Sequence, residues 1–125
     1  MFMRAKMDVG QTPPIEYHPM TGSEEAAVGE ALTLTAGALT KCAADAKPDY
    51  IAVGPAKEGA VPVIKVQDYM TFETTLAADG AALKIGNAVT LSGDALEVTA
   101  TTASGVATIV AMAGTAVGDT VTVRF

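Results

Sequence analysis

Apolar and polar residues alternate in short stretches along most of this chain, and that pattern predicts β-strands. Leu32 and Leu34 alternate with threonines, and Val121, Val123 and Phe125 alternate with polar residues. Pairs such as Ala36-Gly37 and Gly118-Asp119 separate the stretches and predict turns. Short strands at regular spacing, joined by such turns, are typical of an all-β barrel or sandwich.

The alternation predicts ten strands and almost no helix. Helix is expected in a single turn at most, where Ser23 can cap the stretch at Glu24 and Glu25. The ranges predicted as strands are 2–7, 32–35, 39–43, 50–53, 61–66, 69–74, 89–92, 96–100, 107–112 and 121–125. Because the last stretch alternates up to Phe125, we expect it to be a paired strand rather than a fraying tail.

The beginning of the chain allows two interpretations. Residues 2–7 alternate, which fits a short edge strand or an extended arm. Residues 8–22 contain Pro13, Pro14 and Pro19, so we predict that this stretch has no regular structure. It also holds apolar residues, which predicts an arm that lies against another surface rather than a free linker.

Two parts of the chain resemble each other in sequence. Residues 28–44 match residues 85–101 at an offset of 57, and the match continues with 50–53 against 108–111 and 62–65 against 121–124. We therefore predict an internal repeat that forms two related small β lobes. The predicted divisions are an extended N-terminal arm at 1–25, a first repeat at 26–66, a connecting strand at 67–84 and a second repeat at 85–125.

The composition predicts a core that is small for the length of the chain. Half of the 125 residues are apolar, but tryptophan is absent and phenylalanine and tyrosine number three each. Small side chains supply less buried area than aromatic ones. We therefore expect the lobes to pack on each other, exchange strands or assemble with other copies.

The charge argues against nucleic acids and membranes as partners. The formal net charge is −6, and residues 8–125 carry six basic and fourteen acidic side chains. An acidic surface repels both nucleic acid and anionic lipid. No apolar run is long enough to span a membrane, and the N-terminus lacks the apolar segment of a signal peptide.

The residues that usually carry catalysis are scarce. His18 is the single histidine and lies among the prolines, the three serines lie in turn or cap contexts, and Cys42 lies within a predicted strand as a buried or half-buried residue. One cysteine and one histidine cannot form a zinc site, and the acids do not follow a calcium-loop pattern. We predict no enzyme activity, no cofactor and no metal.

Several segments together resemble small β-rich proteins that tailed bacteriophages encode near their head genes. These segments are residues 7–17 (MDVGQTPPIEY), 29–34 (GEALTL), 72–75 (FETT), 99–107 (TATTASGVA) and 121–125 (VTVRF). Such proteins are similar to capsid decoration proteins, which sit on the outer shell as trimers or other small oligomers. The resemblance implies a protein made in the host cytoplasm that binds the major capsid protein and stabilises the virion without catalysis.

The contact with the shell or with other subunits is predicted at the N-terminal arm. Arg4 and Lys6 form the one basic stretch without an acid and can pair with acids on a shell, while apolar residues can fill shallow grooves. The complete predicted set is Arg4, Lys6, Pro13, Pro14, Ile15, Tyr17, His18 and Met20. The competing interpretation is that residues 2–7 belong to an edge strand. Alternative functions are a head fibre base, a tail-associated protein or a carbohydrate-binding β module.

Overall fold

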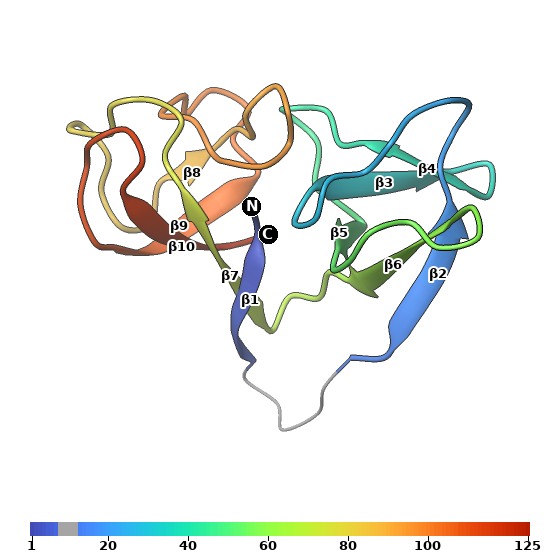
Figure 1. The fold of residues 1–125 in the computed structure, drawn as a ribbon. Helices are drawn as coiled ribbons and strands as arrows, with labels where there is room; N and C mark the ends of the chain where they lie inside the picture. The colour runs from blue at the N-terminus through green and yellow to red at the C-terminus, as the bar shows by residue number, and fades with distance from the viewer. Residues whose placement is uncertain (8–12) are drawn as a thin grey trace.

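The computed structural model describes residues 1–7 and 13–125, and this part of the chain is all β. It contains ten strands in two five-stranded antiparallel sheets and no helix. Figure 1 shows the two sheets side by side, with both termini lying near the middle of the molecule. The predicted all-β class is confirmed. Neither sheet is a closed barrel.

The first sheet combines the first strand of the chain with strands from its second half. Its order is β1 (Met3–Met7), β7 (Met70–Thr75), β10 (Thr120–Arg124), β9 (Ala107–Met112) and β8 (Ala88–Val89). In β7, Phe72 is paired with Arg4 on one side and with Val123 on the other. The prediction that the chain ends in a paired strand is confirmed, because β10 lies between β7 and β9.

The second sheet comes from residues 15–65. Its order is β2 (Ile15–Pro19), β6 (Ala60–Lys65), β5 (Tyr50–Ala52), β3 (Ala31–Thr35) and β4 (Ala38–Lys41). Strands β3 and β4 form a hairpin around Ala36 and Gly37, both of which have positive φ. A single bridge between Met20 and Leu39 brings the two edge strands β2 and β4 together at one end.

Three local predictions are wrong. Residues 8–22 were expected to lack regular structure, yet Ile15–Pro19 is strand β2, while residues 8–12 lie outside the described part. A proline is tolerated on an edge strand because its missing N–H can face away from the sheet. Ser23 lies in a turn rather than a helix, and residues 96–100 contribute only bridges at Val98 instead of a strand.

The two sheets share one core, which holds them together. The larger cluster of buried residues contains Phe72 and Val123 from the first sheet with Ile51 and Ile64 from the second. A smaller cluster lies within the second sheet and includes Tyr50. Strand β5 is buried on both faces because successive side chains alternate, so Ile51 joins the larger cluster and Tyr50 the smaller one.

Phenylalanine rings cluster where the two ends of the chain meet. The ring centroid of Phe125 lies 5.5 Å from that of Phe2 and 5.6 Å from that of Phe72. The backbone N–H of Phe2 also donates to the carbonyl of Gly29 at 2.9 Å, which ties the start of β1 to the second sheet. Residues 2–7 therefore follow the competing interpretation of the sequence, in which they belong to an edge strand of the protein's own sheet.

Candidate functional site

An apolar groove lies between the start of β1 and the second sheet, and it is the strongest candidate for a functional surface. It has a volume of about 400 Å³. Its lining residues are Met1, Phe2, Met3, Arg4, Pro13, Ile15, Val28, Ile51, Ala52, Val53 and Ile64. Buried Ile51, Ala52 and Ile64 form its base, and β1 forms one wall. In Figure 1, β1 lies on the side of its sheet that faces β5 and β6.

Exposed apolar side chains gather at this groove. Among the described residues, ten large apolar side chains are exposed, and five of them line the groove. Those five are Met1, Met3, Ile15, Val28 and Val53, with exposed fractions between 39% and 54%. Isolated apolar residues on a surface are ordinary, but a contiguous group around a hollow is typical of a binding site.

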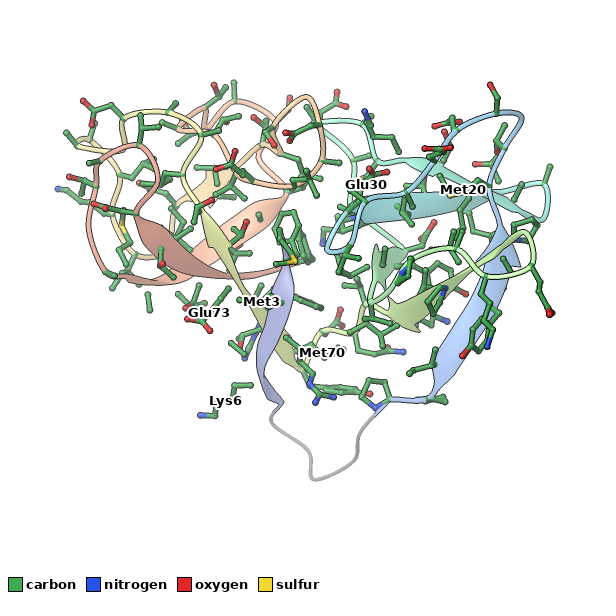
Figure 2. The ribbon with its side chains drawn as sticks, in the orientation of Figure 1. Met3, Lys6, Met20, Glu30, Met70 and Glu73 are labelled. Atoms are coloured by element: carbon green, nitrogen blue, oxygen red, sulfur yellow. The ribbon has the colours of Figure 1, made fainter. Side chains whose placement is uncertain are left out.

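The structure brings together three of the predicted contact residues and separates the others. Arg4, Pro13 and Ile15 line the groove. Lys6 is exposed further along β1, and Figure 2 shows its side chain pointing away from the ribbon. Pro14 is exposed and does not line the groove.

The remaining predicted residues lie elsewhere on the second sheet. Tyr17 is exposed beside the turn that contains Lys57 and Glu58. Met20 packs against the smaller buried cluster. His18 is half-buried on the opposite face of β2 from Tyr17.

His18 belongs to a small polar cluster rather than to the groove. Its Nε2 lies 3.1 Å from Oε1 of Glu16, and the hydroxyl of Tyr50 donates to the same oxygen at 3.1 Å. The hydrogen bond with His18 is the main cause that lowers the pKa of Glu16. These contacts link β2 to β5 across β6, which lies between them in the same sheet. The cluster has an acid and an imidazole but no serine, threonine or cysteine within it that could act as a nucleophile.

The other groups with reactive potential are in structural roles. Burial raises the pKa of the Cys42 thiol to about 11, and its sulfur donates to the carbonyl of Ala46 at 3.2 Å. The predicted burial of Cys42 is confirmed. Ser92 donates to Asp94 at 2.6 Å and accepts from the N–H of Glu97, which closes a turn. Within the described ranges, no three His, Cys, Asp or Glu side chains come close enough to hold a metal ion.

Glu30 is a buried carboxylate at the place where the two halves of the molecule meet (Figure 2). It is 4% exposed, its Oε1 accepts from the N–H of Ala27 at 3.4 Å, and its Oε2 has no hydrogen-bond partner in the described part of the chain. Burial raises the pKa of Glu30, because the charged form loses its contact with water.

We expect the stability of the protein to fall as pH rises through the titration of Glu30. Between the ordinary pKa near 4.5 and the raised pKa of the folded state, the folded protein holds more protons than the unfolded chain. Glu30→Gln has no carboxyl group to titrate, so it removes this loss. The free energy of unfolding of the variant, relative to that of the wild type, should therefore rise by about 1 kcal/mol from pH 4 to pH 8. Urea unfolding at both pH values measures the gain.

Glu25→Gln is the matched control for this prediction. Glu25 is exposed, so its substitution should shift the stability by the same small amount at both pH values. If the free energies of unfolding of Glu30→Gln and Glu25→Gln change equally between the two pH values, the predicted effect of the buried Glu30 is wrong.

Sequence reasoning missed most of the groove. Met1 and Met3 were not in the predicted contact set, and Val28 and Val53 lie next to glycines at the ends of predicted elements. The one available signal was at Val28, a β-branched residue outside the predicted strands, whereas Val53 ends the predicted strand at 50–53. No helix in the described part of the chain is long and apolar enough to cross a bilayer.

The comparisons with known proteins leave the geometry as the main guide. No family model matches the chain, and neither the curated proteins nor the solved structures contain a match.

Proposed function

We propose that this chain is a structural protein that binds a protein shell through the apolar groove, as a capsid decoration protein of a tailed bacteriophage. Its partner is the major capsid protein on the outer surface of the head, which it stabilises. The resemblance of its sequence segments to phage decoration proteins points to this partner. The observation that carries the proposal is the gathering of exposed Met1, Met3, Ile15, Val28 and Val53 around one hollow.

The chemistry of the described residues favours binding over catalysis. The polar clusters that the structure brings together act within the fold: Glu16 with His18 and Tyr50 orients β2, and Ser92 with Asp94 closes a turn. An acyl- or glycosyl-transfer enzyme needs an activated nucleophile or a pair of carboxylates at a substrate cleft. Among the described residues that line the groove, Arg4 is the only charged one. We infer that the protein needs neither a cofactor nor a metal for this role.

We further propose that the protein is a homotrimer on the capsid exterior, made in the host cytoplasm. Its small-residue core supports assembly with other copies, because such a core buries little area for its length. Many identical sites on a shell also allow weak individual contacts to act together.

We also infer that the two sheets derive from one repeated β unit. In support, the order β2-β6-β5-β3 in one sheet matches the order β7-β10-β9-β8 in the other. Gly29 and Gly86 both have positive φ, and their N–H groups donate to the carbonyls of Ala52 and Ile109, which differ by the same 57 positions. In this arrangement the first unit begins at β2 and the second at β7, and both begin earlier in the chain than the matching sequence segments. Strand β1 is then an addition to the sheet of the second unit.

Adding the purified protein to undecorated phage heads tests the proposal. We expect saturable binding at a fixed ratio, a rise in the temperature at which the heads rupture, and a mass of three chains by light scattering. The heads should be assembled from a major capsid protein encoded beside this chain. Absence of binding would leave a tail or fibre role, and a single chain mass at micromolar concentration would contradict the trimer.

A further inference from the structure

Glu30 and Asn87 occupy corresponding turns in the two halves of the chain. In each turn the side-chain oxygen accepts a hydrogen bond from the N–H of the residue three positions earlier. That residue is Ala27 in the first turn, at 3.4 Å, and Lys84 in the second, at 2.9 Å. The residue numbers of both pairs differ by 57. Because a neutral amide makes the same contact at Asn87, the turn at Glu30 does not need a group that ionises.

The surroundings of the two turns differ. Asn87 is half-buried, whereas Glu30 is 4% exposed. Within the described ranges, Oε2 of Glu30 is buried without a hydrogen-bond partner. A buried carboxylate that lacks partners is costly when it carries its charge and much less so when it is protonated. The first turn therefore contains a group whose proton affects the fold, and the second turn does not.

Two backbone hydrogen bonds next to Glu30 join the two sheets, and we call this pair of bonds the seam. The carbonyl of Gly29 accepts from the N–H of Phe2, at the start of β1, at 2.9 Å. The N–H of Ala31, in β3, donates to the carbonyl of Ala95 at 2.9 Å. Ala95 lies in the turn between β8 and β9. The backbone on both sides of Glu30 is thus bonded to the opposite sheet.

The charges around Glu30 do not compensate its ionisation. Burial raises the pKa of Glu30, and the hydrogen bond from Ala27 opposes this shift only in part. Three charged groups of the described part face the carboxyl group: Lys41 on β4, Glu24 in the loop before β3 and Asp94 in the turn after β8. Lys41 favours the ionised form, but it is exposed and therefore screened by water. Glu24 and Asp94 both oppose the ionised form.

We propose that Glu30 is a pH-sensitive switch for the seam. While the carboxyl group holds its proton, it stays buried and the seam is closed. When the proton leaves to solvent, the hydrogen bonds of the seam open locally so that water reaches the carboxylate. Local opening exposes the charge at a lower cost than unfolding the whole chain. This inference goes beyond the proposed function and does not depend on it.

Amide hydrogen exchange of the full chain at pH 4 and pH 8 tests the switch. Protection is the measured rate corrected for the chemical exchange rate at each pH. We expect the protection of the Phe2 and Ala31 amides to fall about tenfold or more from pH 4 to pH 8. The reference amide is that of Ile109, which donates to the carbonyl of Asn87 at 2.8 Å. Its protection should change less than about twofold.

Two variants assign the effect to the carboxyl group at the seam. Glu30→Gln keeps every other titratable group, including His18 and the terminal amine of Met1, so a change that these groups cause would persist in it. We expect the protection of Ala31 in Glu30→Gln to change less than about twofold between the two pH values. Asn87→Asp places a carboxyl group at the corresponding turn outside the seam. It should leave the protection of Ile109 within about twofold.

Three results would overturn the proposal. An equal loss of protection at Ala31 and Ile109 in the wild type would show that the whole fold loosens rather than the seam. A pH response that persists in Glu30→Gln would assign the effect to another group. A loss at Ile109 in Asn87→Asp as large as that at Ala31 in the wild type would show that any carboxylate in this turn has the effect. If Glu30→Gln fails to fold, the first and third comparisons decide.

Discussion

Replacing Phe72 with alanine should lower the free energy of unfolding by about 3–5 kcal/mol. Phe72 is fully buried at the centre of β7, where it is paired with Arg4 of β1 and Val123 of β10. Its ring also lies 5.6 Å from that of Phe125. The substitution removes buried apolar surface and leaves a cavity that rigid neighbouring strands cannot fill.

Urea unfolding measures this loss, and Phe72→Leu is the control. Leucine keeps most of the volume, so it should cost less than the alanine variant by at least about 1 kcal/mol. Because Phe72 shares a core with Ile51 of the second sheet, methyl signals of Val123 and Leu32 should disappear at the same urea concentration. A loss under about 1 kcal/mol for Phe72→Ala would contradict the packing described here.

Among the described glycines with ordinary backbone angles, Gly105 should be the one at which alanine is most damaging. A Cβ atom at Gly105 would lie 2.1 Å from the carbonyl oxygen of Ala88 and 2.7 Å from the nitrogen of Val89. Both atoms belong to the backbone of β8, so no side chain can rotate to make room. The strand has to move away from β9, and we expect a cost of about 3 kcal/mol or more.

Gly93→Ala is the matched control for this substitution. No atom lies within 4 Å of a Cβ atom built at Gly93, and its φ lies outside the left-handed region. We expect a change within about 1 kcal/mol, with a gain possible because alanine restricts the unfolded chain. Urea unfolding of both variants decides the matter: similar stabilities would show that β8 accommodates a side chain at Gly105.

The strands themselves could be predicted because alternation is a local property. Tyr50 and Ala52 face one cluster while Ile51 faces the other, and this follows from the two-residue period of a strand. The same local reasoning failed at Ile15–Pro19, since proline is unfavourable in a strand interior but acceptable on an edge. Whether a strand lies at an edge depends on strand order, which alternation does not encode.

The sequence by itself determined that this protein is built from short β-strands, that its final strand is paired, and that Cys42 is at least half-buried. These features follow from residue type and spacing along the chain. Only the tertiary structure decided that β1 pairs with β7, that Glu30 is buried, and that Met3, Ile15 and Val53 meet around one groove. The physical reason is that these residues lie in segments far apart in sequence, and which distant segments meet depends on strand pairing and on the packing of the whole core.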